Sequence, residues 1–145
     1  MTEPLVVRPQ RLTRTAWAVA IVLLGVFAGI GLLLRSAPPG QLQFQLGDQL
    51  AITALGLAGA AAVLWFTRFR VVADPSGVRV RNALGEKHVP WGVVVGVRFV
   101  PGDSWAHLQL HDDELLPLLA VQANDGRLAH EAVDHLRRLL EESRR

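Results

Sequence analysis

The chain has 145 residues, of which 50% are hydrophobic and 19% charged. This balance is too apolar for an ordinary soluble domain and too charged for a chain lying wholly in a membrane, so the chain must be segmented. The formal charge of +2 is too small for the basic field that nucleic-acid binding requires. Because there is no cysteine, disulfides, thiolate zinc sites and cysteine nucleophiles are excluded.

The N-terminal part predicts a short tail and then a membrane span. Residues 1–14 contain two prolines, three arginines and no apolar periodicity. No charged residue occurs from Thr15 to Leu34, and about 20 residues at 1.5 Å each cross the roughly 30 Å of a bilayer's hydrocarbon. A secretory signal peptide is the alternative, although its apolar core usually has only about 7–15 residues. We therefore expect a basic tail over 1–14 and a transmembrane helix over about 15–34.

A second apolar run follows after a break. Prolines and glycines within residues 35–49 argue against one continuous helix. Inside this loop, Gln41–Leu46 alternates polar with apolar residues, which predicts apolar side chains resting in the membrane interface or, alternatively, a strand that docks an external partner. Residues 50–67 form the second predicted span. Together the spans predict a transmembrane hairpin over 15–67 with an external loop over 35–49.

Small residues in both spans predict close helix packing. Gly25 and Gly29 form a G-x-x-x-G pair, and Ala54, Ala58 and Ala62 line one face of the second span. Small side chains at this spacing let helix backbones approach closely. We expect the helices of one hairpin to pack on each other here, with a dimerisation motif as the alternative.

The arginines predict the orientation of the hairpin. Three arginines precede the first span, Arg68 and Arg70 follow the second span, and only Arg35 lies in the connecting loop. The positive-inside rule then places both termini in the cytoplasm, and Trp17 and Trp65 fall at the same inner interface. Fourteen arginines beside a single lysine, with abundant Ala, Gly, Val and Leu, are typical of a GC-rich bacterial genome. We expect a multi-pass protein of a bacterial inner membrane.

From Arg68 the apolar pattern changes at once to a period of two, which is typical of strands with one buried face. Asp74–Gly77 has the residues of a type I turn and predicts a first hairpin, and Asn82–Gly85 predicts a second. On a later strand Val93, Val95, Val97 and Phe99 are expected to alternate, with Gly96 as a bulge or close approach, and Pro117 predicts an edge or bulge position. The later strands are expected over 87–90, 93–99, 106–110 and 115–121.

The period changes again near Gly126, where an amphipathic helix is expected to close the open end of the β layer. Asn124 or Asp125 is available as its N-cap. Its apolar stripe comprises Leu128, Ala132, Val133, Leu136, Leu139 and Leu140.

Six or seven short antiparallel strands followed by one C-terminal helix is the order of a pleckstrin-homology (PH)-type barrel or sandwich. Three runs make the resemblance specific: Val71–Asn82, Val89-Pro90-Trp91, and Leu119–Gly126. These resemble the bacterial PH domain family of small actinobacterial membrane proteins, over about residues 68–140. The resemblance implies an α+β, PH-like domain over 68–145 joined to a membrane α-helical hairpin, and it implies membrane association without a defined biochemical role.

Catalytic and metal sites have almost no support in the sequence. His107 and His111 are four residues apart on a predicted strand, about 13 Å, so they cannot share one zinc ion. The acidic turn at Asp112–Glu114 is typical of a solvated surface, and no nucleophile, P-loop or dinucleotide motif is present. We expect no enzyme activity, no cofactor and no metal. Trp91 is interpreted as a structural anchor of the core, with a ligand-stacking platform as the alternative.

Arginines form the one constellation with a functional interpretation. If the first turn is Asp74–Gly77, Val71 pairs with Val80 and Val72 with Arg79, and two arginines lie directly opposite each other. Like charges in that arrangement are destabilising without an anionic partner or ample solvent. The candidate anionic-lipid contacts are Arg68, Arg70, Arg79 and Arg81; ordinary solvated arginines are the alternative.

Two spans already hold the domain at the membrane, so lipid affinity is not needed to recruit it. We therefore rank a non-catalytic scaffold or protein-interaction module, binding an unknown protein or a second copy, above a weak sensor of anionic lipid headgroups. The candidate protein-interaction face is the charged side of the C-terminal helix, at Glu131, Asp134, Arg137 and Arg138.

Overall fold

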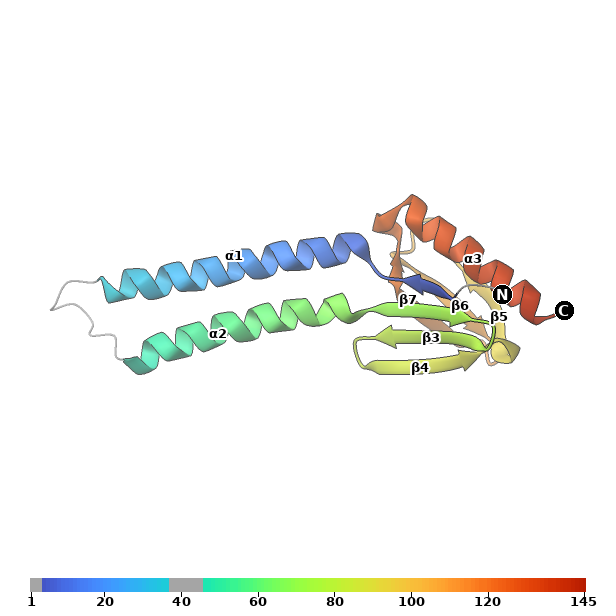
Figure 1. Ribbon diagram of the computed structural model, residues 1–145, viewed down its shortest axis with the longest axis horizontal. Coiled ribbons are helices and arrows are strands. Elements are labelled where there is room, and N and C mark those ends of the chain that lie inside the picture. Colours follow the sequence, from blue (N-terminus) through green and yellow to red (C-terminus); the bar gives the residue numbers. More distant parts are fainter. Residues whose placement is uncertain (1–3, 37–45) are drawn as a thin grey trace. The chain divides into compact units, whose positions relative to one another are not determined.

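The computed structural model describes residues 4–36 and 46–145 (Figure 1). The chain divides into two compact units, one made of residues 1–11 with 68–145 and the other of residues 12–67. Most of the alternating segment Gln41–Leu46 lies outside the described residues, so the two interpretations of that loop remain predictions.

Residues 12–67 are an apolar helical pair followed by a short turn. Helix α1 spans Gln10–Arg35, helix α2 spans Leu46–Trp65, and a 3-10 turn follows over Phe66–Arg68. Both helices are long and apolar enough to cross a membrane, and few of their side chains are buried by the protein itself. Helix α2 begins four residues before the predicted start of the second span. Its first turn holds Asp48, and an acidic residue is favourable there because it faces the positive end of the helix dipole.

The two helices pack on each other, but not through the predicted small residues. Gly56 and Ala60 are the buried residues of α2, whereas Ala54, Ala58 and Ala62 are exposed. A Cβ added to Gly56 would lie 2.8 Å from the Cβ of Phe27, while one added to Gly25 or Gly29 would meet nothing within 4 Å. Several stripes of small residues fit the helical period equally well, and the sequence spacing cannot tell which of them faces the neighbouring helix.

The first sheet has four antiparallel strands in the order β1-β2-β3-β4. They are β1 (Leu5–Val7), β2 (Arg70–Asp74), β3 (Gly77–Asn82) and β4 (Gly85–Pro90). Strand β1 differs from the basic tail expected over residues 1–14. It has only three residues between Pro4 and Arg8, too few to show periodicity. Its partner, β2, lies more than sixty residues later in the chain, with Val7 opposite Val71.

The tight β2–β3 hairpin has the predicted register. Val71 lies opposite Val80 and Val72 opposite Arg79, as the Asp74–Gly77 turn requires. Gly77 is needed at the end of this turn because a Cβ there would lie 2.5 Å from the carbonyl oxygen of Val89. The hairpin therefore fits closely against the neighbouring end of β4.

The second sheet has three antiparallel strands in the order β5-β6-β7. Its register shifts between Val94 and Gly96, which is the bulge that Gly96 predicted. Because a bulge inserts one extra residue, Val94 and Val97 are buried and Val93 and Val95 are exposed, so the simple alternation expected for this strand is wrong. The three strands are β5 (Val94–Arg98), β6 (Trp105–Leu110) and β7 (Leu115–Gln122).

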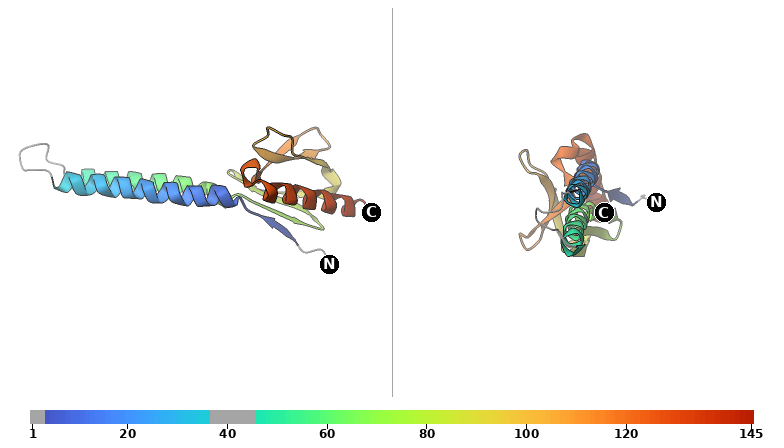
Figure 2. Two further views of the ribbon diagram at one scale, coloured as in Figure 1. Left: turned by 90° about the horizontal axis from the view of Figure 1, so that it is seen from above. Right: turned by 90° about the vertical axis from the view of Figure 1, so that its left-hand side faces the viewer.

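Helix α3 (Arg127–Ser143) packs against strands of both sheets, including the edge strands β1 and β5 (Figures 1 and 2). The predicted stripe is buried except at Leu128, which is half exposed. The N-cap is Gly126, which offers no side chain, so Asn124 and Asp125 do not cap this helix. The carboxylate of Asp125 instead accepts a hydrogen bond, 3.2 Å long, from the backbone N–H of Arg11.

Candidate binding surfaces

The predicted arginine surface lies on the face of the first sheet that points away from the core. Register places Arg70 opposite Arg81. Along β2, Val72 lies between Arg70 and Asp74, and all three side chains are on the same face of the sheet. These arginines and Arg79 line a cavity of about 210 Å³ together with Val72 and Glu86. The structure thus brings three of the four predicted arginines together. The fourth, Arg68, ends the 3-10 turn before β2 and does not line this cavity.

The fold supplies acidic neighbours for two of these arginines. Arg79 contacts Asp74 at 3.4 Å, and Glu86 on β4 lies directly opposite Arg81. Sequence reasoning missed Glu86, although the two-residue turn before Gly85 is enough to extend the register to β4. Arg70 shares the cavity with Glu86 but forms no ion pair within the described residues, and its buried Nε has no hydrogen-bond partner there. Arg70 is thus the arginine of this cavity without a directly opposed or bonded acidic residue.

Asp74 is fixed by the turn that it begins. The hydroxyl and backbone N–H of Ser76 both donate to its Oδ1. These hydrogen bonds, with a further contribution from Arg79, hold the pKa of Asp74 below its ordinary value of 3.8. The backbone carbonyl of Asp74 accepts the indole N–H of Trp91 at 2.7 Å, and the Trp91 side chain is buried. Trp91 thus lies in the core, where it ties the β4 end to the first hairpin.

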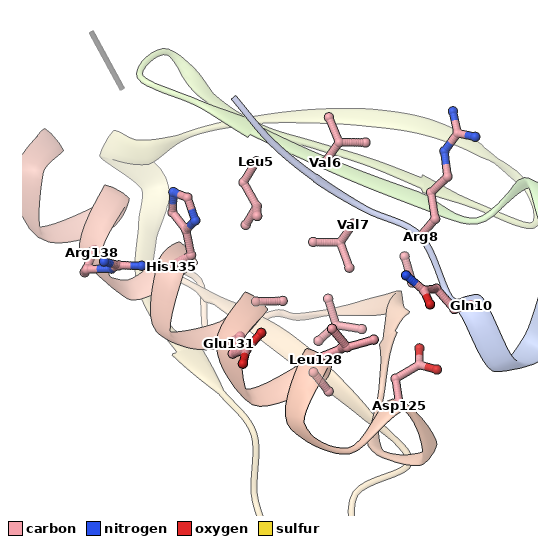
Figure 3. Close-up of a pocket in the computed structure, with 14 residues that line it drawn as sticks. Leu5, Val6, Val7, Arg8, Gln10, Asp125, Leu128, Glu131, His135 and Arg138 are labelled. Carbon is pink, nitrogen blue, oxygen red and sulfur yellow. The ribbon is translucent and has the colours of Figure 1, made fainter. Parts of the chain in front are cut away.

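A second cavity, of about 450 Å³, lies between β1 and α3 (Figure 3). Leu5 and Val7 point from β1 towards the helix, whereas the exposed Val6 points to the opposite side of the strand. The cavity is also lined by Leu128, whose side chain the amphipathic pattern had assigned to the core. We call this cavity the β1–α3 groove; its charged and polar lining residues are Arg8, Gln10, Asp125, Glu131, His135 and Arg138.

The predicted charged face of α3 divides into two sides. Glu131 and Arg138 line the β1–α3 groove. Asp134 and Arg137 form an ion pair at 3.6 Å, and the guanidinium of Arg137 donates to the carbonyl of Val97 on β5. Sequence spacing placed all four on one polar face, but it could not indicate that the two sheets flank the helix on different sides. The hollow of the β1–α3 groove lies on the side of Glu131 and Arg138.

The four sheet edges are protected to different degrees. Natural proteins block edge strands with charges, prolines or covering segments, because unpaired backbone groups invite another strand. The guanidinium of Arg137 on α3 donates to the β5 carbonyl of Val97, and that of Arg144, the C-cap of α3, donates to the carbonyls of Val94 and Val95. Strand β7 carries Pro117, and β4 carries Lys87 paired with Glu114 at 3.6 Å. Strand β1 is uncharged and free of proline, and among the described residues it has a partner strand on one side only.

The histidines are not gathered into a metal site. The ring of His107 lies 3.9 Å from Asp103, and His130 bonds the carbonyl of Gly126 and contacts the ring of Phe99 edge-on. In residues 4–36 and 46–145, no group of three potential metal-ligating side chains comes together. The described surface therefore offers an arginine cavity and a mixed groove as its candidate binding sites.

Two antiparallel sheets with a C-terminal helix packed against strands of both define a PH-like domain, without a closed barrel. The chain belongs to the bacterial PH domain family, whose model matches residues 68–139. The match begins directly after the helical pair, so strand β1 lies outside it. The resemblance inferred from the sequence is thus confirmed.

The most informative relatives are mycobacterial. The uncharacterized protein Rv1417 of Mycobacterium tuberculosis is 42% identical over 135 residues, which cover 93% of this chain and 87% of that protein. The same values hold for the uncharacterized protein Mb1452 of Mycobacterium bovis. Low molecular weight protein antigen 6 of M. tuberculosis is 44% identical over 54 residues, or 37% of this chain and 47% of that protein. No solved structure matches the chain.

Proposed function

We propose that the chain is a membrane-anchored, non-catalytic interaction module whose PH-like domain binds an extended segment of another protein in the β1–α3 groove at the cytoplasmic face. The observation that carries this proposal is the open edge of β1 beside a cavity of about 450 Å³. An added strand would gain main-chain hydrogen bonds from the edge and side-chain contacts from the groove.

The lining of the groove defines the chemistry of the segment. Apolar side chains at alternate positions would contact Leu5, Val7 and Leu128, which line the floor of the groove. An acidic residue of the partner would complement Arg138, which forms no ion pair within the described residues, whereas Glu131 is already within 3.4 Å of Arg127. The segment is short, because β1 has only three residues and prolines at positions 4 and 9 flank it.

Orientation at the membrane is also part of the proposal. Residues before α1 and after α2 pair as neighbouring strands, which supports an even number of crossings between them. The positive-inside rule supports the cytoplasm as the side that holds the domain. Both chain termini would then lie in the cytoplasm of a bacterial cell, at its inner membrane.

In-cell photocrosslinking tests the protein-binding proposal. A photoreactive residue would replace Glu131 or Leu128 in the groove, and Asp134 and Asp112 would serve as matched exposed positions outside it. We expect a specific protein adduct from the groove positions that is lost when Val6 is replaced by proline, which removes an edge N–H. Equal adducts from all four positions, or adducts to lipid alone, would refute the groove as a protein site. If the groove positions crosslink to a second copy of the chain, the segment bound in the groove belongs to that copy and not to another protein.

The second candidate function is recognition of anionic lipid headgroups by Arg70, Arg79 and Arg81. The convergence of these three arginines on one cavity favours it, because a headgroup phosphate could accept hydrogen bonds from more than one guanidinium. Each basic residue near an anionic surface contributes about 1 kcal/mol at modest salt.

The lipid test compares the melting temperature of the full chain in nanodiscs of phosphatidylcholine with and without phosphatidylglycerol. The anionic lipid should stabilise the wild type, and the gain should disappear in high salt. It should also disappear when the three arginines are replaced by glutamine. A gain that survives both changes would exclude the arginine cavity as the lipid site.

A further inference from the structure

The turn between β3 and β4 carries an exposed apolar tip. Leu84 is fully exposed, at 104% of its reference area, and it is preceded by Ala83. Tight turns favour glycine, proline and small polar residues, and the β2–β3 turn follows that rule with Pro75 and Ser76. Exposing a leucine side chain to water is unfavourable, so the residues around Leu84 indicate whether it has a binding role.

Beside this tip is an apolar hollow. Ala83 and Leu84 line a cavity of about 420 Å³ with Pro117 and Leu119 of β7. The side-chain amide of Asn82 donates to the carbonyl of Pro117 at 3.0 Å, which fixes the base of the turn against β7. Leu84 therefore lies at the end of an apolar surface that the β3–β4 turn forms with β7 of the other sheet.

Register places this surface at one particular end of the domain. Arg70, the first residue of β2, comes two residues after the turn that ends at Arg68, and it lies opposite Arg81, near the end of β3. Val7 of β1 is paired at the same end, and the chain continues from it into α1 at Gln10. The end of the sheet with the β3–β4 turn is thus the end at which the chain leaves for α1 and returns from α2.

We infer that the β3–β4 turn inserts Leu84 into the headgroup–acyl boundary of the membrane that the helices cross. The tip lies three residues beyond Arg81, at most roughly 10 Å, so it can reach the interface next to the point where α2 emerges. Arg79 and Arg81 of the arginine cavity lie on β3, which leads into this turn, so basic side chains flank the apolar tip. Such a pairing of apolar tip and basic flank is the chemistry of interfacial membrane contact.

This inference rests on the two helices spanning the membrane, and it is independent of what the β1–α3 groove binds. It gives the domain a third point of attachment besides the two helix connections. Contact at the β3–β4 turn would fix how the domain is turned relative to the membrane.

The test is depth measurement in the full chain, reconstituted in phosphatidylcholine nanodiscs. Because the protein has no cysteine, single cysteines can replace Leu57 in α2, Leu84 at the tip and Ser76 in the opposite turn. Each would carry an environment-sensitive fluorophore, quenched by nitroxide lipids with a shallow or a deep label or by iodide in water. We expect shallow-lipid quenching at position 84, deep-lipid quenching at position 57 and iodide quenching at position 76.

A second pair of variants controls for the apolar character of the probe. The fluorophore is placed on Ala83→Cys, with either Leu84 or Leu84→Asp beside it. Lipid quenching should fall clearly in the aspartate variant. If the probes at 83 and 84 are quenched only by iodide, as at 76, while position 57 is quenched by lipid, the inference is overturned and the spans stand. If position 57 is not quenched by lipid either, both the spans and the inference fail.

Discussion

At the scale of single residues, the arginine pair Arg70 and Arg81 could be placed from the sequence alone. A turn with Asp first, Pro second and Gly fourth allows one hairpin register, and that register sets the opposing residues. The position of Glu86 opposite Arg81 follows in the same way once the turn before Gly85 is used to extend the register to β4. The contact of Asp74 with Arg79 does not, because it depends on side-chain conformation.

Asp74 gives a prediction about pH. Its pKa is lowered in the folded state by the hydrogen bonds from Ser76, so the charged form is favoured by folding. This stabilisation is fully present above the unfolded pKa of 3.8 and is lost as pH falls through the lower folded value. Asp74→Asn should therefore lower the melting temperature at neutral pH, and its difference from wild type should shrink below about pH 4.

Thermal unfolding of the full chain from pH 3 to pH 7 would measure this difference. Asp112→Asn, in the exposed β6–β7 turn, is the matched control and should show no such dependence. A difference for Asp74→Asn that stays constant or grows towards low pH would show that its carboxylate charge is not the source of stability.

At the scale of elements, the strands and helices that depend on local periodicity were predictable, and those that depend on tertiary contacts were not. The β2–β3 hairpin, Gly96 as a bulge and the stripe of α3 all follow from nearby residues. Strand β1 has only three residues and exists because β2 is available beside it. The prediction of which β5 side chains point inward was wrong, because a bulge reverses the alternation after it. The sequence shows this reversal only if the exact position of the bulge is known.

Alanine substitutions at two glycines of α2 are predicted to differ in their effect on the stability of the helical pair. A Cβ on Gly56 would lie 2.8 Å from the Cβ of Phe27, an atom that cannot move unless its helix moves. A Cβ on Gly59 would lie 2.8 Å from the Cδ2 of Leu23, the flexible end of a side chain. Gly56→Ala should therefore cost about 1–3 kcal/mol of hairpin stability, whereas Gly59→Ala should be nearly neutral.

Melting temperatures of the full chain in one detergent would test the ranking. Gly25→Ala is the control for the general effect of alanine in a membrane helix, since nothing lies within 4 Å of its added Cβ. Equal effects of all three substitutions would contradict the close contact between Gly56 and Phe27.

At the scale of the whole molecule, the helical pair is inserted between two neighbouring strands of one sheet. Strand β1 precedes α1 and strand β2 follows α2, yet Leu5, Val6 and Val7 pair with β2 in a continuous ladder. If the helices cross a bilayer, the domain can assemble only when both flanking segments reach the same side. The sequence indicated the same arrangement independently through its arginines, although it did not reveal that the N-terminal segment belongs to the domain.

The most direct test of the account is the sidedness of the chain in bacterial spheroplasts, using single cysteines and a membrane-impermeant maleimide. Pro4→Cys reports on the start of β1, Ser76→Cys on the β2–β3 turn, and Asp48→Cys on the start of α2. We predict that only the Asp48 variant is labelled in intact spheroplasts and that the other two are labelled only after permeabilisation. Labelling of the Pro4 and Ser76 variants from opposite sides, or of both from outside, would contradict a hairpin that anchors one cytoplasmic domain.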